Sequence, residues 1–126
     1  MSYSRTQKLL KKTLPRDVKI SIKAAQDIKA ENIVVLALHE LSSFTDYFIV
    51  MHGNSSKQNI ALCNNIEREL RNIKVKPLSV EGRQYAEWVL MDYGNFIIHI
   101  FTPDMRQYYA LEKLWGDAPK LTYYER

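Results

Sequence analysis

Residues 87–102 read "EWVLMDYGNFIIHIFT", two apolar runs separated by one glycine and one asparagine. A two-residue connection of this kind is typical of a β-hairpin, because the turn needs a positive φ that glycine adopts without steric cost. The turn also sets the register, which should pair Leu90 with His99 and Trp88 with Phe101. The stretch therefore predicts two adjacent antiparallel strands and assigns each side chain to a face.

The two faces of this hairpin differ in composition. One face should lie in the core because all its side chains are apolar or aromatic: Val89, Met91, Tyr93, Phe96, Ile98 and Ile100. The other face mixes large apolar and polar side chains: Trp88, Leu90, Asp92, Ile97, His99 and Phe101. A buried face rarely holds both a carboxylate and an imidazole, and a solvated face rarely exposes so many large apolar groups. Two interpretations remain open, a protein-binding surface anchored by Trp88 or a face that another segment partly covers.

Apolar spacing predicts the elements on either side of the hairpin. They are, in chain order, a helix from Asp17, strands at 32–38 and 45–53, a helix at 56–72, a strand at 78–82, the hairpin, and a helix from Thr102 to Gly116. The predicted fold is α/β (α+β), a mixed five-stranded sheet packed with about three helices. The predicted domain spans residues 17–119, between a basic arm at 1–16 and a tail at 120–126.

The whole chain has 126 residues, which fits one domain, and a single cysteine, Cys63. One cysteine excludes an internal disulfide and fits a reducing compartment, so a cytoplasmic location is expected. Cys63 lies in an apolar helical pattern and is predicted to be buried. The longest apolar runs fall far short of the ~18 residues of a membrane span, so no membrane association is expected.

The basic residues are concentrated at the N-terminus. Residues 1–16 contain five basic and no acidic side chains, and the rest of the chain is close to neutral. Three interpretations remain open for this arm: a solvated extension of the first helix, a contact with rRNA phosphates, or the remnant of a targeting segment.

The sequence Gly53-Asn54-Ser55-Ser56, between a strand and a helix, raises the question of a phosphate site. A phosphate loop of the Walker type needs further glycines and a lysine, and a nucleotidyltransferase needs paired carboxylates for Mg²⁺. The next strands offer Glu81 and Asp92 only singly. We therefore predict that the serines cap the helix and that the chain is not an enzyme and has no cofactor. The three histidines and Cys63 lack the spacing of metal ligands, so no metal site is predicted.

Six segments of the chain resemble the Iojap-like ribosomal silencing factors, the family also known as RsfS. They are "LSSFTDYFIV" (41–50), the "GNSS" turn at 53, "PLSVEG" (77–82), "WVLMDYG" (88–94), "IIHIFTP" (97–103) and "YALEKLWGDAP" (109–119). The likeness runs in unbroken order over about residues 17–119. The chain departs from the usual family pattern at Ala37, Asn54 and Asn95, where the family has aspartate, threonine and aspartate. The missing carboxylate at position 37 weakens an enzymatic interpretation further.

The resemblance implies a nucleotidyltransferase-like fold without catalytic carboxylates, and a binding function. Members of the family bind the large ribosomal subunit through ribosomal protein number fourteen. They thereby block joining of the small subunit and lower translation when nutrients are scarce, whereas organelle members act in assembly of the large subunit. Two rival interpretations remain open. One is a residual nucleotidyltransferase or nucleotide-binding protein that uses Ser55, Ser56 and Asp92, and the other is an organelle factor for assembly of the large subunit.

Six residues are predicted to contact the ribosomal protein: Trp88, Leu90, Asp92, His99, Thr45 and Asp46. Trp88 is the expected anchor, and Asp92 is expected to pair with an arginine or lysine of the partner. An alternative for Asp46 is that it only fixes the preceding loop. Three further aromatic residues match the family but are predicted more often as core than as contacts: Tyr108, Tyr109 and Trp115. The chain is expected to be a monomer or a weak homodimer away from the ribosome.

Overall fold

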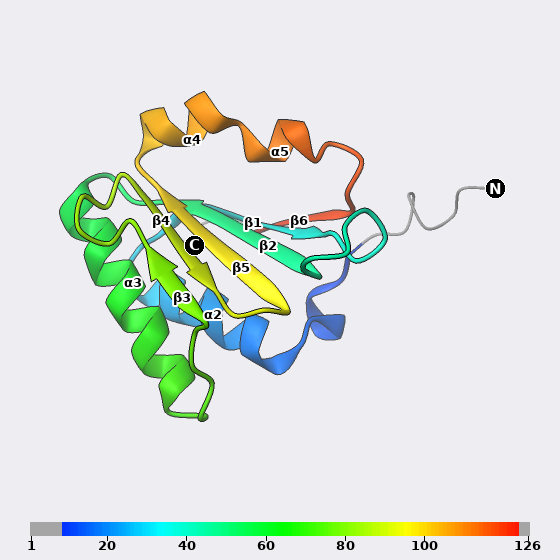
Figure 1. Cartoon of the computed structure of the whole chain (residues 1–126), viewed down its shortest axis with the longest axis horizontal. Coiled ribbons are helices and arrows are strands. Elements are labelled where there is room, and N and C mark those ends of the chain that lie inside the picture. Colours follow the sequence, from blue (N-terminus) through cyan, green and yellow to red (C-terminus); the bar gives the residue numbers. More distant parts are fainter. Residues whose placement is uncertain (1–8, 124–126) are drawn as a thin grey trace.

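A mixed six-stranded sheet with helices on both faces forms the body of the protein (Figure 1). The computed structural model describes residues 9–123 of the chain. The elements in chain order are η1 (Lys11–Thr13), α2 (Arg16–Asp27), β1 (Glu31–Ala37), β2 (Tyr47–His52), α3 (Ser56–Arg71), β3 (Ser79–Glu81), β4 (Trp88–Asp92), β5 (Phe96–Phe101), α4 (Pro103–Tyr109), α5 (Leu111–Leu114) and β6 (Lys120–Tyr123). The strand order is β3-β4-β5-β2-β1-β6, with β2 parallel to β5 and the other pairs antiparallel. The predicted α+β class is confirmed, with one strand more than predicted.

The hairpin of β4 and β5 has the predicted register. Trp88 pairs with Phe101 and Leu90 with His99. Gly94, in the turn, has a φ of 86°, which glycine adopts without steric cost. The expected core face of the hairpin is confirmed. Tyr93 is half-buried and packs against the core, and the other five side chains are buried in it: Val89, Met91, Phe96, Ile98 and Ile100.

The C-terminal segment differs from the prediction at three points. Lys120–Tyr123, expected to lie in a tail outside the domain, forms β6 and pairs with β1. The predicted single helix is divided into α4 and α5 because Ala110 has a left-handed backbone, with φ 49° and ψ 50°. Thr102 precedes α4 as predicted, but its side chain makes no capping hydrogen bond within the described part of the chain. Alanine favours helices, so the sequence did not indicate the break at Ala110.

The N-terminal boundary lies slightly earlier than predicted. Helix α2 begins at Arg16, one residue before the expected start, and Leu14 of the predicted arm is buried in the core. Lys11–Thr13 forms the short helix η1. The rest of the predicted arm, residues 1–8, lies outside the described residues. The last part of the arm therefore belongs to the fold.

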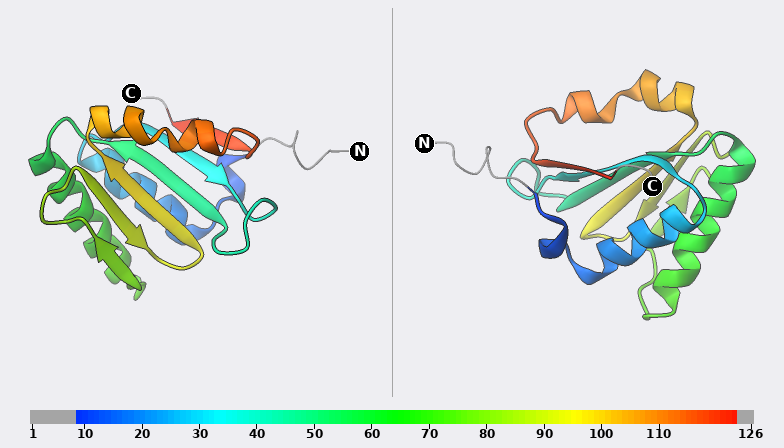
Figure 2. Two further views of the ribbon diagram at one scale, coloured as in Figure 1. Left: turned by 45° about the horizontal axis from the view of Figure 1, so that its top comes forward. Right: turned by 180° about the vertical axis from the view of Figure 1, so that it is seen from behind.

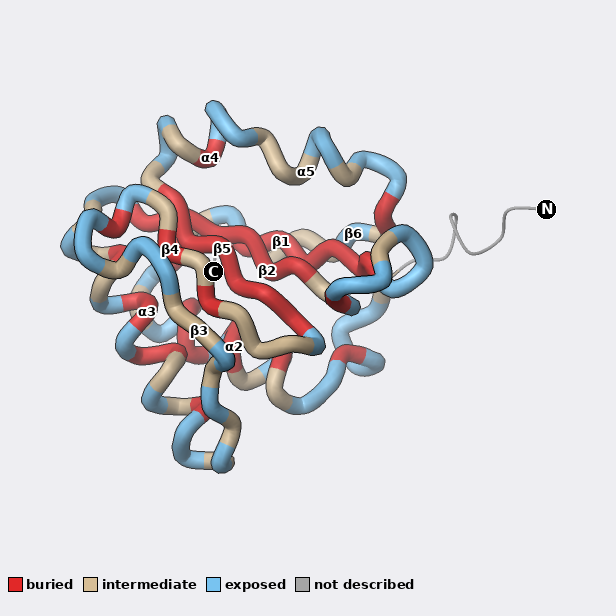
Figure 3. Tube along the Cα trace, viewed as in Figure 1, coloured by how far each residue is buried: buried red, intermediate tan, exposed pale blue. Residues whose placement is uncertain are grey.

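Both faces of the sheet are covered, and the layers differ (Figure 2). Helices α2 and α3 lie side by side on one face, and α4 and α5 cross the other. The inner strands are buried on both sides, including every residue of β5 (Figure 3). A second core under α4 and α5 consists of eight buried residues: Val34, Leu36, Leu38, Phe48, Val50, Ile97, Phe101 and Ala118. Half-buried side chains from β4, α4, α5 and the residue after α5 complete it: Trp88, Leu90, Met105, Leu111 and Trp115.

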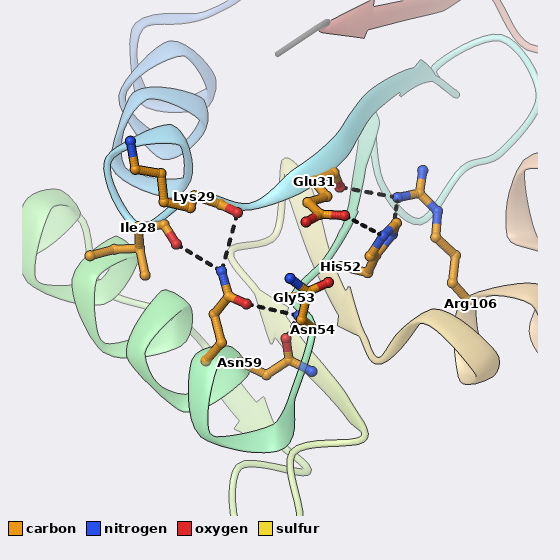
Figure 4. Close-up of polar contacts among 9 residues, drawn as sticks. Ile28, Lys29, Glu31, His52, Gly53, Asn54, Asn59 and Arg106 are labelled. Carbon is orange, nitrogen blue, oxygen red and sulfur yellow. Dashed lines mark hydrogen bonds and ion pairs between the residues drawn. The ribbon is translucent and has the colours of Figure 1, made fainter. Parts of the chain in front are cut away.

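Arg106 fastens α4 to the sheet. Its guanidinium donates two hydrogen bonds to the Glu112 carboxylate, at 3.1 and 2.9 Å, and one to Nδ1 of His52 at 3.0 Å. Nε2 of His52 then faces the Glu31 carboxylate at 3.4 Å (Figure 4). Bidentate, charge-assisted bonds are among the strongest that a side chain makes. This cluster therefore joins α4 and α5 to the ends of β1 and β2.

We expect Arg106→Met to lower the free energy of unfolding by about 2 kcal/mol, because the apolar stem remains but the charge-assisted bonds are lost. Hydrogen exchange over residues 103–115 should quicken more than exchange in α3. The control is Lys113→Met on α5, an exposed position where the change should stay within about 0.5 kcal/mol. Equal stability of the two variants would show that Arg106 does not hold α4 and α5 in place.

Candidate partner-binding surface

The structure gives the six predicted contact residues different degrees of exposure. Trp88, Leu90 and Asp92 on β4 are half-buried, and Asp46 is exposed. Thr45 and His99 are buried, with exposed fractions of 5% and 4%. Thr45 and His99 therefore do not offer an exposed side chain to a partner in the free chain. The contact role of the six residues stays a prediction.

The burial of His99 follows from the covering segment. The second face of the sheet is apolar, and α4 and α5 lie over it because it needs a cover. The interpretation of a face partly covered by another segment is thus correct for the part of the hairpin next to β2. Thr45 has a structural role, since its hydroxyl donates to the Gly94 carbonyl at 3.0 Å and fastens the start of β2 to the hairpin turn.

Trp88 lies at the border between the covered and open parts of this face. Its indole N–H donates to Nδ1 of His99 at 3.0 Å. Its ring stacks on Phe101, with centroids 5.2 Å apart, and contacts Tyr109 of α4 at 4.2 Å. Such packing stiffens the side chain, so Trp88 presents a fixed edge to the surface.

Aromatic side chains form a connected row under and beside α4 and α5. We call this the aromatic row; its members, in order of contact, are Tyr108, Tyr109, Trp88, His99, Phe48, Trp115 and Phe44. The middle of the row is buried, and its ends are open, with exposed fractions of 76% for Tyr108 and 59% for Phe44. Leu114, on α5, is also 72% exposed. Exposed aromatic groups on a rigid base are typical of protein-binding sites.

Part of this surface was not predicted from the sequence. Tyr108 and Tyr109 are exposed, with exposed fractions of 76% and 41%, so the expectation that they lie in the core is wrong, whereas Trp115 is half-buried. The helical spacing that suggested burial fails because Ala110 interrupts the helix and changes its direction. Phe44 was not predicted as a contact residue either. It lies in the serine-containing loop "LSSF", where a buried side chain is unusual, so the sequence did give a signal for its exposure.

The two candidate carboxylates differ in role. Asp92 accepts a hydrogen bond from the Gly94 backbone N–H at 2.8 Å, so it caps the hairpin turn. Asp46 is exposed, and its backbone bonds to Leu38 and Asn95 fix the loop between β1 and β2. The carboxylate of Asp46 is therefore the one more readily available to a basic partner.

The turn before α3 is closed by its own side chains. Ser55 Oγ accepts from the Gln58 N–H, which confirms the predicted N-cap. Asn59 Oδ1 accepts from the Gly53 N–H at 3.0 Å, and Gln58 Oε1 accepts from the Asn54 N–H at 2.8 Å. A Cβ on Gly53 would lie 2.5 Å from Asn59 Oδ1, so the glycine serves this close approach. Three backbone donors of this turn, on Gly53, Asn54 and Gln58, are thus already used.

The described residues give no evidence for a metal site or for a reactive cysteine. Within residues 9–123, no three His, Cys, Asp or Glu side chains gather in a way that could hold a metal ion. Cys63 is fully buried, and burial raises the pKa of its thiol to about 11, which makes it a poor nucleophile. None of the helices between residues 9 and 123 is long and apolar enough to cross a membrane.

His99 is an uncharged histidine inside the aromatic row. Burial lowers its pKa to about 4. Because Nδ1 accepts from Trp88, the proton of the neutral ring lies on Nε2, which has no hydrogen-bond partner among the described residues. Protonation would place a charge among aromatic rings, so the fold favours the neutral form.

This burial predicts a pH dependence of stability. The unfolded chain binds a proton near the ordinary pKa of 6.5, whereas the folded chain resists protonation until about pH 4. The stabilisation is therefore complete above pH 6.5 and is lost as the pH falls, by about 2 kcal/mol between pH 7 and 5. Urea unfolding should show a smaller acid loss for His99→Gln, while the exposed His39→Gln keeps the parent dependence. Identical pH profiles for the parent and His99→Gln would contradict this account.

Comparison with known proteins places the chain in a family. The family model described as "Ribosomal silencing factor during starvation" matches residues 11–125. The ribosomal silencing factor RsfS of Bacillus subtilis is 42% identical over 102 residues, covering 81% of this chain and 86% of the relative. That of Halalkalibacterium halodurans is 39% identical, covering 81% and 87%. A crystal structure of a Chromobacterium violaceum protein superimposes with a TM-score of 0.78 at 37% identity, covering 79% of this chain and 83% of that one. The chain therefore belongs to the family of ribosomal silencing factors.

Proposed function

We propose that the chain represses translation by binding the large ribosomal subunit through its ribosomal protein number fourteen. In this position it blocks joining of the small subunit when nutrients are scarce. It acts without catalysis and by steric exclusion. A cytoplasmic location and a monomer or weak homodimer away from the ribosome stay predictions.

The observation that carries the proposal is the aromatic row, buried in the middle and open at its ends. A rigid base lowers the entropy cost of binding, because the exposed rings are already held in place. Tyr108, Phe44 and Leu114 supply apolar contact area, and Asp46 supplies a carboxylate near Phe44 for a basic ribosomal protein. The backbone N–H groups of Gly53 and Asn54 already donate to side chains of α3, which argues against the rival proposal of a nucleotide-binding protein.

Co-sedimentation with purified ribosomal subunits tests the proposal. The chain should sediment with large subunits and not with small subunits. Addition of small subunits after preincubation should then give less of the joined ribosome, measured by light scattering. The absence of binding to large subunits at physiological salt would refute the proposed function.

Two exposed side chains allow a direct test of the surface. The double variant Tyr108→Ala and Leu114→Ala should weaken binding to the large subunit by about 2 kcal/mol or more, a factor of about 30, because exposed apolar anchors dominate interface energies. Its free energy of unfolding should change by no more than about 1 kcal/mol, since each exposed position contributes at most about 0.5.

The matched control is Tyr85→Ala with Leu78→Ala, which removes the same side chains with exposed fractions of 76% and 75%. These residues lie on either side of β3, an edge strand of the sheet, and outside the aromatic row. If both double variants bind equally well, the proposed surface is wrong. Trp88→Ala is less decisive than expected from sequence, because it also deprives the buried His99 of its hydrogen-bond donor and so lowers stability.

A further inference from the structure

A row of basic side chains follows η1 and the first turns of α2. Arg16, Lys19 and Lys23 are spaced three and four residues apart, so they share one face of α2, and all three are exposed. Lys19 Nζ donates to the Lys12 carbonyl at 3.1 Å, which brings the end of η1 beside this face. The basic row lies on the opposite side of the sheet from α4 and α5 (Figure 2).

Two of the three cations of the basic row have no acidic partner among the described residues. Of its members, Lys23 pairs with Asp27 at 3.4 Å, whereas Arg16 and Lys19 contact no carboxylate within residues 9–123. Helix α3 differs, because its arginines pair with its own glutamates. Arg16 is also at the first position of α2, where the helix dipole disfavours a cation. The ion pairs of the described residues therefore do not neutralise Arg16 and Lys19.

A groove runs along the basic row between α2 and α3. Its volume is about 390 Å³, and its lining includes the apolar side chains of Ile20, Ala24 and Ile73. Three cations and one carboxylate line it from α2: Arg16, Lys19, Lys23 and Asp27. Glu69 and Asn72 line it from the end of α3. Apolar contact area, amide and carboxylate groups for base edges, and adjacent cations are what an unstacked nucleotide requires.

We propose that the basic row and the groove bind single-stranded RNA, with phosphates on Arg16 and Lys19 and one unstacked base in the groove. Arg16 and Lys19, which have no carboxylate partner among the described residues, attract a polyanion. The groove favours a single strand because a duplex keeps its bases stacked inside. In the proposed complex this surface adds an rRNA contact that is separate from the ribosomal protein. It also extends to the described residues the expectation that the basic arm contacts rRNA.

The test is fluorescence anisotropy with a labelled, unstructured 20-nucleotide RNA, measured with the full chain from 0.05 to 0.3 M salt. At 0.1 M salt, Arg16→Gln with Lys19→Gln should bind roughly 20-fold more weakly, and the slope of log K against log salt should fall by about 1.4, since each lost phosphate contact contributes about 0.7. The matched control, Lys57→Gln with Lys76→Gln, removes two exposed charges elsewhere and should bind nearly as well as the parent. An RNA with abasic sites should bind roughly tenfold more weakly if a base fills the groove.

Four outcomes would overturn the proposal: no RNA binding by the parent at 0.1 M salt, equal loss in the two double variants, equal affinity for the abasic RNA, or equally strong competition by poly-glutamate. The last result would assign the surface to an acidic protein instead. Unfolding curves establish that both double variants are folded. Because the probe is free RNA, failure here leaves the co-sedimentation result with large subunits unaffected.

Discussion

The inner strands of this sheet are apolar on both faces, and the fold follows from the need to cover both. Two regular helices, α2 and α3, cover one face with a large interlocking core. The other face is left to α4 and α5, two short helices of seven and four residues. Eleven helical residues do not cover six strands, so the margins of this face remain open. The proposed surface lies at those margins.

Polar contacts hold α4 and α5 against the sheet at one end. Arg106 joins Glu112 on α5 to His52 and the Glu31 carbonyl at the ends of β2 and β1. From that point the helices extend over the aromatic row, whose middle is buried and whose ends are open. The same burial that makes His99 uncharged also makes Trp88 rigid, because the two rings share a hydrogen bond. Stability and the shape of the surface therefore depend on the same contacts.

The sequence predicted the hairpin register, the capping serine of α3 and the position of α2, because each depends on neighbours in the chain. It did not predict β6, since four residues such as Lys120–Tyr123 form a strand only beside β1. It also placed Tyr108 and Tyr109 in the core, because no residue type signals the break at Ala110. The second hairpin face mixes large apolar side chains with a carboxylate and an imidazole, and this composition alone indicated an unusual surface. Only the tertiary contacts showed that α4 and α5 cover the part of this face next to β2.

The central claim is that the margins of the α4–α5 face meet the large subunit. Hydrogen exchange of the free chain and of the chain bound to purified large subunits tests it most directly. The account predicts that protection on binding concentrates in residues 41–47 and 103–116, with less change in α3 than in either segment. Protection confined to α3 and the β3–β4 connection, with residues 103–116 exchanging as in the free chain, would contradict it.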